Sequence, residues 1–179
     1  LLLLTSIIVV GGLAAFLVLD EVDAGTLTAL RVTPVTLRSF FGYRAATVVA
    51  VTTVYVAVTI PLTGLVPSSL VWPLIPIGMV AGLSAMVTML LIVAVASNKV
   101  QGIAMLRLLG LLIAGIPCLP WFVDSAWNLA FGVLPPYWAA KAFWVACAGG
   151  AWWPYLLGGV VVNLAAGWPL LRRFVAANS

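Results

Sequence analysis

Three of the four carboxylates in this chain, Asp20, Glu21 and Asp23, stand within four residues of one another. Such a trio beside a membrane could hold a divalent cation for an enzyme that modifies lipids. A hard cation needs several oxygen ligands at once, however, and the fourth carboxylate, Asp124, lies far along the chain. There is no histidine, and therefore no Ser–His pair and no imidazole ligand. We expect no metal site, no catalytic residues and no enzyme activity.

The chain also lacks the phosphate-binding loop of ATPases, G-x-x-x-x-G-K-[ST]. Its two lysines, Lys99 and Lys141, are followed by valine and alanine. We therefore expect no cofactor bound by this chain, and any use of ATP and Mg²⁺ requires a partner subunit. Nucleic acid is not an expected partner either, because the eight Lys and Arg residues are scattered rather than clustered on a basic face.

Composition indicates that a lipid bilayer is the solvent for most of the chain. Only 7% of the residues are charged, against about 25% in an ordinary soluble domain, and 65% are hydrophobic. The mean hydropathy is +1.26. A soluble fold of 179 residues could not keep so much apolar surface away from water.

The apolar runs predict an all-α, polytopic membrane helical bundle, with residues 1–179 forming a single transmembrane domain. A span needs roughly 20 mostly apolar residues. Five runs qualify, at residues 1–19, 45–65, 72–96, 103–120 and 153–171. Between 121 and 150 the chain stays apolar, but Pro135 and Pro136, followed by Tyr137 and Trp138, break it into two pieces that are too short to span. We expect re-entrant or interfacial helices there, on the outer face and before the last span.

The distribution of basic residues predicts the orientation, because cytoplasmic loops of membrane proteins are enriched in Lys and Arg. Placing the 20–44 loop in the cytoplasm leaves only Lys141 outside. The residues then inside are Arg31, Arg38, Arg44, Lys99, Arg107, Arg172 and Arg173. The C-terminus is therefore expected in the cytoplasm, and residue 1 is expected outside.

Half of the twelve charges fall between residues 20 and 44, where the pattern predicts a short amphipathic helix in the loop. Gly25 and Thr26 suit its start, since a hydroxyl can cap the first free amides. Leu27 and Leu30 share one face, and Pro34 ends the helix. Two interpretations remain open: a solvated helix that covers the membrane face, or a docking element for a soluble partner.

The run Glu21-x-x-x-Gly25-Thr26-Leu27-x-x-Leu30-x-x-Thr33-Pro34, followed by Phe40-x-x-Tyr43-Arg44, resembles the first cytoplasmic loop of ABC-2 type transporter permeases. The Pro-Pro-Tyr-Trp run at 135–138 is similar to a segment before their last span. The resemblance implies six spans. The sequence would then be the C-terminal portion of a longer chain, lacking the first membrane helix.

The resemblance also implies a mechanism, in which the loop helix docks on a nucleotide-binding ATPase subunit and transmits its closure to the membrane helices. The implied docking residues are Glu21, Gly25, Thr26, Leu27, Leu30, Arg31, Thr33 and Pro34. A salt bridge from Glu21 to Arg38 or Arg44 is the alternative role of that carboxylate.

Other implied partners are membrane lipid and a second permease copy or paralogue, in a bacterial cytoplasmic membrane. The implied function is export of a hydrophobic or amphipathic compound, drug-like or lipid-like. The alternatives are a lipid or polysaccharide exporter, or a membrane scaffold that transports nothing.

A few polar residues inside the spans either join helices or line the substrate path. They are Thr52, Tyr55, Thr59, Ser84, Thr88 and Asn163. Gly78 and Gly82 suggest a close-packing face, and a second such face, Gly159, Asn163 and Gly167, could serve a dimer interface. Cys118 and Cys147 both fall near the outer face, where they either pair or remain two small apolar residues.

Overall fold

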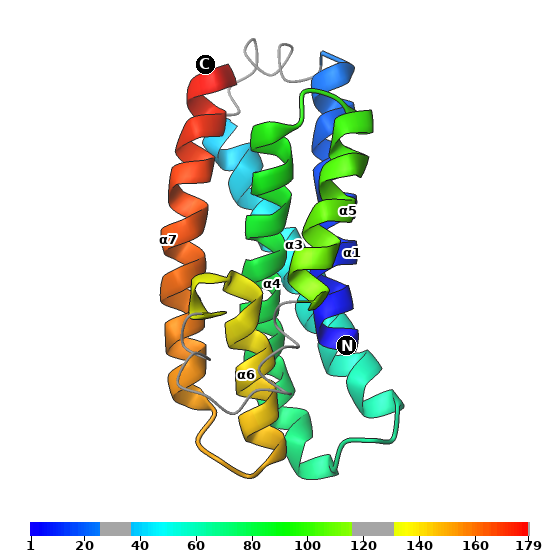
Figure 1. The fold of residues 1–179 in the computed structure, drawn as a ribbon, viewed down its shortest axis with the longest axis vertical. Coiled ribbons are helices and arrows are strands. Elements are labelled where there is room, and N and C mark those ends of the chain that lie inside the picture. The colour runs from blue at the N-terminus through cyan, green and yellow to red at the C-terminus, as the bar shows by residue number, and fades with distance from the viewer. Residues whose placement is uncertain (26–36, 116–130, 179) are drawn as a thin grey trace.

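The computed structural model describes residues 1–25, 37–115 and 131–178, and every regular element in those ranges is a helix. Figure 1 shows an upright bundle of long helices. In chain order the elements are α1 (Leu2–Asp23), α3 (Leu37–Leu62), the 3₁₀ turn η1 (Ser68–Leu70), α4 (Val71–Val95), α5 (Lys99–Gly115), α6 (Pro135–Cys147) and α7 (Trp153–Asn178). The expected all-α helical bundle is confirmed.

Among the described residues, four helices are long and apolar enough to cross a bilayer. They cover Leu2–Asp23, Ser39–Leu62, Ser68–Val95 and Trp153–Phe174, and they match four of the five predicted spans. The chain is therefore a multi-pass membrane protein. The remaining predicted span, 103–120, falls on α5, which has 17 described residues. The last five residues of that predicted span lie outside the described residues.

Helix α4 is the centre of the bundle, and it packs against α3, α1, α7 and α6. Of its apolar span 72% is buried, whereas only 22% of the span in α3 and 17% of the span in α7 is buried. In water such apolar outer faces would be unstable, but in a bilayer they face lipid or another membrane helix.

Glycines let α4 approach its neighbours closely. A Cβ added at Gly82 would lie 2.7 Å from the Cα of Val49 in α3, and one at Gly78 would lie 3.0 Å from the Cα of Thr53. The packing face predicted at these two glycines is therefore confirmed, and it joins α4 to α3.

The second small-residue face does not point outward to a dimer partner. A Cβ at Gly159 would meet Val80 of α4 at 2.6 Å, and one at Gly167 would meet Met86 at 3.2 Å. Asn163, between them, is fully buried. These residues seat α7 on α4 within one chain, which corrects the dimer-interface expectation.

The three clustered carboxylates follow the first predicted span, 1–19, but they belong to the end of α1 itself. Helix α1 runs to Asp23, so its last turns carry Asp20, Glu21 and Asp23. Gly25 follows with φ = +70°, a left-handed conformation that glycine adopts without strain. Gly25 therefore marks where the chain leaves α1.

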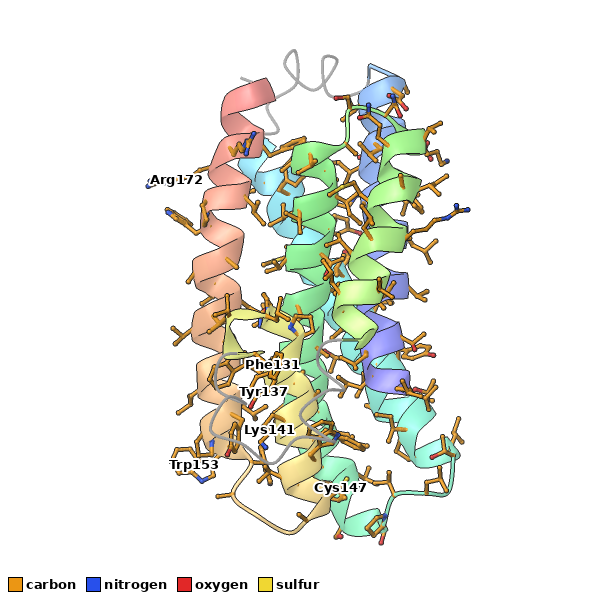
Figure 2. All side chains as sticks on the ribbon, in the orientation of Figure 1. Phe131, Tyr137, Lys141, Cys147, Trp153 and Arg172 are labelled. Atoms are coloured by element: carbon orange, nitrogen blue, oxygen red, sulfur yellow. The ribbon has the colours of Figure 1, made fainter. Side chains whose placement is uncertain are left out.

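One end of the bundle gathers basic side chains. There α1 and α4 end, α3 and α5 begin, and α7 ends, at the top of Figure 1. We call it the basic end, defined by Arg44, Lys99, Arg172 and Arg173. Figure 2 shows Arg172 toward this end and Lys141 toward the opposite one. The fold thus separates the basic residues as the positive-inside bias predicts.

Candidate functional site

At the basic end, Glu21 of α1 forms a salt bridge with Arg44 of α3. Both side chains are largely buried, with 26% of Glu21 and 20% of Arg44 exposed. The Glu21 Oε2 atom is buried and has no hydrogen-bond partner among the described residues. The guanidinium of Arg44 also lies 5.7 Å from the ring centroid of Phe40, one turn earlier in α3. Of the two roles considered for Glu21, the salt bridge with Arg44 is present.

A second ion pair joins α1 to α5. The Nζ atom of Lys99 lies 2.9 Å from both carboxylate oxygens of Asp20, and about half of each side chain is exposed. Lys99 is the first residue of α5 because Asn98 caps the helix: its Oδ1 accepts from the amide of Gln101 at 2.9 Å. This cap starts the helix four residues before the apolar run that predicted it.

These ion pairs compensate for unfavourable electrostatics at the C-terminal end of α1. The C-terminal end of a helix carries partial negative charge, which disfavours carboxylates, and the last turn of α1 contains no basic residue. Arg44 and Lys99 supply the positive charge from neighbouring helices. The arrangement therefore depends on three helices meeting at one point.

Most of the expected docking residues lie outside the described residues, namely Thr26, Leu27, Leu30, Arg31, Thr33 and Pro34. Glu21 and Gly25 are described, and they stand at the end of α1. The segment 24–36 connects α1 to α3 at the basic end (Figure 1). Its docking role stays a prediction.

The polar residues proposed for a substrate path do not form one group. Thr52, Ser84 and Thr88 are buried, and their hydroxyls donate to the carbonyl four residues earlier at 2.8 to 3.1 Å. Tyr55 is exposed and Thr59 is partly exposed on α3. The buried hydroxyls are satisfied within their own helices, which lets them pack in an apolar core, and the path stays a prediction.

Asn163 is the exception among these residues. Its Nδ2 donates to the carbonyl of Gly159 at 2.7 Å, but its buried Oδ1 has no hydrogen-bond partner among the described residues. It lies on the face of α7 that packs on α4. An unpaired acceptor at this depth is costly.

The proline break before the last span begins α6. Pro135 and Pro136 open the helix, where the missing N–H of proline is not needed. Helix α6 has 13 residues, too few to span. It packs against α7 and α4 and stands upright, with Phe131, Tyr137 and Lys141 successively nearer the end opposite the basic end (Figure 2). Of the two expected forms, re-entrant and interfacial, the upright packing favours the re-entrant one.

Trp138 fixes α6 to α7. Its Nε1 donates to the carbonyl of Gly132 at 2.8 Å, and Tyr137, which is buried, packs edge-on to it at 5.8 Å between ring centroids. A Cβ added at Gly158 would come within 2.3 Å of the Trp138 ring. The Pro-Pro-Tyr-Trp run therefore supplies both the start of this helix and its anchor.

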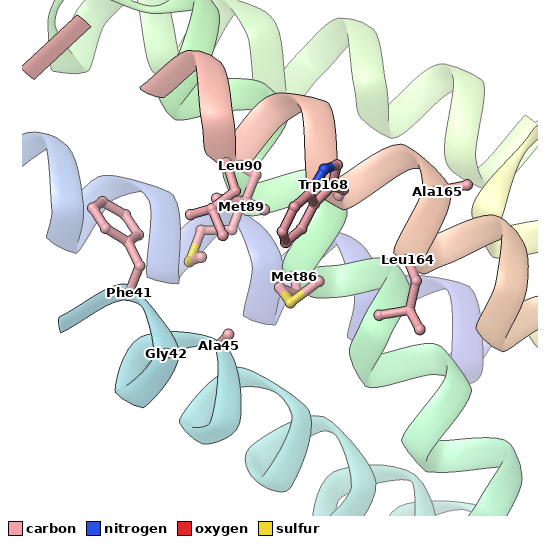
Figure 3. Close-up of a pocket in the computed structure, with 11 residues that line it drawn as sticks. Phe41, Gly42, Ala45, Met86, Met89, Leu90, Leu164, Ala165 and Trp168 are labelled. Carbon is pink, nitrogen blue, oxygen red and sulfur yellow. The ribbon is translucent and has the colours of Figure 1, made fainter. Parts of the chain in front are cut away.

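An apolar groove lies between α3 and α7, with α4 as its floor (Figure 3). It encloses about 660 Å³, within the range of small-molecule pockets. Met86 and Met89 line the floor, Phe41 lines one wall, and Trp168, with Arg172 4.7 Å from its ring centroid, lines the other. None of the described residues that line it is titratable, so it suits apolar or aromatic surface rather than chemistry.

Among the described residues, no group of three His, Cys, Asp or Glu side chains could hold a metal ion. Cys147 is an exposed free thiol in this part of the chain, and partial burial of the thiol group raises its pKa. Cys118 lies outside the described residues, so the disulfide stays a prediction.

Comparison with known proteins decides the family. The family described as "Fluoroquinolones export permease protein Rv2686c-like" matches residues 1–171. This chain belongs to that family. Two relatives from Mycobacterium tuberculosis, strains CDC 1551 / Oshkosh and H37Rv, are each named a fluoroquinolones export permease protein. Each is 71% identical over 178 residues, covering 99% of this chain and 71% of its relative. No solved structure matches this chain.

Membership makes the protein an export permease, a transport protein rather than an enzyme. The site of this permease that sequence reasoning missed is the pairing of Asp20 with Lys99. These residues are 79 positions apart, and from the sequence Lys99 was used only to predict the orientation of the chain in the membrane. The excess of carboxylates at the end of α1 was the available clue, since such a helix end needs external positive charge.

Proposed function

We propose that this export permease is the membrane-spanning subunit of an ATP-driven exporter of the ABC-2 type. The observation that carries the proposal is its 71% identity over 178 residues with proteins named fluoroquinolones export permease. The run from Glu21 to Pro34 supports the ABC-2 subtype, because it resembles the first loop of such permeases and connects α1 to α3 at the basic end.

A separate nucleotide-binding subunit supplies ATP and Mg²⁺, since this chain has no phosphate-binding loop. That subunit docks on the segment 24–36, with Leu27 and Leu30 as the apolar contacts and Arg31 at their rim. Gly25, with its left-handed φ, and Pro34 bound the docking helix. Closure of the ATPase then moves the helices that flank the segment.

The basic end faces the cytoplasm of a bacterial cell, with the permease in the cytoplasmic membrane and its C-terminus inside. Helix α7 ends at the basic end, which is consistent with that orientation. A further span precedes α1, and a second copy or a paralogue completes the pore. The relatives are longer than this chain, which leaves room for that span.

The cargo is a drug-like compound of the fluoroquinolone class. The names of the relatives support this class. The chemical character of the chain agrees, because only 7% of its residues are charged and its groove between α3 and α7 is apolar with aromatic walls. Such surroundings favour apolar and aromatic cargo over strongly ionic cargo.

Co-purification tests the docking claim. The full-length permease is expected to retain an ATPase that contains a phosphate-binding loop, and Leu27→Asp with Leu30→Asp is expected to release it. Burying two leucines is worth roughly 3 to 6 kcal/mol, so their loss weakens binding by at least about a hundredfold. Leu62→Asp with Leu65→Asp is the matched control, with the same spacing on exposed positions at the opposite end.

The control is expected to keep the ATPase bound. Retention of the ATPase by the Leu27 and Leu30 variant would show that the segment is not the docking element. Failure of any ATPase to co-purify with the unmodified full-length chain would count against ATP-driven transport.

A further inference from the structure

Two ion pairs between side chains join the end of α1 to α3 and to α5, in addition to the connection through the chain itself. Segment 24–36 is attached covalently to α1 and to α3. Helix α5 has no such attachment, because it enters the bundle after α4. It packs mainly along α1, where a Cβ at Gly102 would lie 2.8 Å from the Cδ1 of Leu19.

The Asp20–Lys99 pair supplies the missing connection. Lys99 stands at the first position of α5 and contacts both carboxylate oxygens of Asp20, one helical turn before α1 ends. Gly102 also packs against the side chain of Leu19, the residue next to Asp20, so α1 and α5 are in contact directly beside this pair. A force on the end of α1 therefore reaches the first turn of α5.

The Glu21–Arg44 pair links α1 and α3, the two helices that segment 24–36 connects. Its partly buried carboxylate has one oxygen bound to Arg44 and one without a hydrogen-bond partner among the described residues. Because the pair is shielded from water, its attraction is screened less than that of an exposed pair. It holds the start of α3 against the end of α1.

We infer that Asp20, Lys99, Glu21 and Arg44 form an ionic clamp that makes α1, α3 and α5 move as one unit under load from segment 24–36. These four are positioning residues for transport, and the inference rests on the proposed function, in which an ATPase applies that load. The carboxylates stand at a helix end that disfavours them, so helix stability does not explain their placement. The clamp does.

The decisive variant is Asp20→Asn in the full-length permease, with Asp23→Asn as its matched control. Asp23 is exposed in the same turn and forms no ion pair with any residue whose side chain the structure describes. In the complex with the ATPase, reconstituted in vesicles, fluoroquinolone moved per ATP hydrolysed is expected to fall about two- to fivefold for Asp20→Asn, the scale of an exposed ion pair. Asp23→Asn is expected to leave it unchanged.

Charge exchange separates clamping from general damage. The double variant Asp20→Lys with Lys99→Asp is expected to recover most of the transport per ATP, whereas Lys99→Gln alone is expected to lose it. A loss in Asp20→Asn that the exchanged pair does not recover, or no loss at all, would overturn the clamp. Glu21→Gln is expected to lower transport per ATP as Asp20→Asn does. Normal transport per ATP in that variant would show that the Glu21–Arg44 pair, and with it α3, is not part of the clamp.

Hydrogen exchange of the permease alone distinguishes failure of the clamp from failure of the proposed function. In lipid nanodiscs, Asp20→Asn is expected to speed amide exchange about two- to fivefold in the first turn of α5, relative to Asp23→Asn. Unchanged exchange would overturn the tie between α1 and α5 whether or not an ATPase binds. Faster exchange in a chain that retains no ATPase would support the connection between α1 and α5. It would overturn the proposed function, and with it the transmission of force from an ATPase through this connection.

Discussion

Replacing Gly82 by alanine tests the packing that organises the bundle. The added Cβ would lie 2.7 Å from the Cα of Val49 and 2.9 Å from its carbonyl oxygen. Ordinary contacts begin at about 3.4 Å, so the helices must separate locally by 3.4 − 2.7, or about 0.7 Å. Backbone atoms cannot rotate away as a flexible side chain can. Overpacking of this kind costs about 1 to 3 kcal/mol.

The interface concerned is the most extensive in the described part of the chain, between α3 and α4. For a chain of this size, 1 kcal/mol shifts the melting temperature by about 2 to 4 °C. Gly82→Ala is therefore expected to lower it by about 2 to 12 °C, measured by intrinsic tryptophan fluorescence on the purified permease in detergent.

Gly42→Ala provides the matched control, because it is the same substitution in a helix that shares this interface. No atom of the described residues lies within 4 Å of a Cβ placed at Gly42. Alanine is a better helix former than glycine by up to about 1 kcal/mol, so stability is expected to stay equal or rise slightly. If Gly82→Ala melts at the same temperature as Gly42→Ala, the close approach of α3 and α4 is refuted.

Three further predictions concern the ends of the helices. Trp138→Phe removes the indole donor to the Gly132 carbonyl and is expected to cost about 1 kcal/mol in the free energy of unfolding; an unchanged denaturation midpoint would contradict the anchor. Gly25→Ala places a side chain at φ = +70° and is expected to cost about 1 to 2 kcal/mol, seen as faster hydrogen exchange in the last turn of α1; unaltered exchange would count against the left-handed end. In a Cys118→Ser background, the raised pKa of Cys147 means less reactive thiolate at neutral pH, so the rate of maleimide labelling should keep rising above the ordinary thiol pKa; a plateau at that pKa would oppose it.

Sequence patterns were sufficient for the architecture because a bilayer imposes simple rules. Span length and the grouping of basic residues follow from hydrocarbon thickness and from charge asymmetry, and neither requires knowledge of which helices touch. Four spans were predictable on that basis, and the spacing of small residues predicted the Gly78–Gly82 packing face.

Pairings between distant residues were not predictable in the same way. A helix boundary set by capping is invisible to hydropathy, so the start of α5 at Lys99 and the extension of α1 to Asp23 were both missed. The spacing of Gly159, Asn163 and Gly167 identified a packing face but not its partner, since one face can serve α4 or a second copy equally well.

In the proposed function, ATP drives drug export through the segment between α1 and α3. Inside-out vesicles that contain the full-length permease and its ATPase test it directly, by the uptake of a fluoroquinolone with and without ATP. Uptake is expected to require ATP and to be abolished by Leu27→Asp with Leu30→Asp, while Leu62→Asp with Leu65→Asp leaves it intact. Uptake that proceeds without ATP, or that survives the Leu27 and Leu30 substitutions, would refute ATP-driven export through this segment.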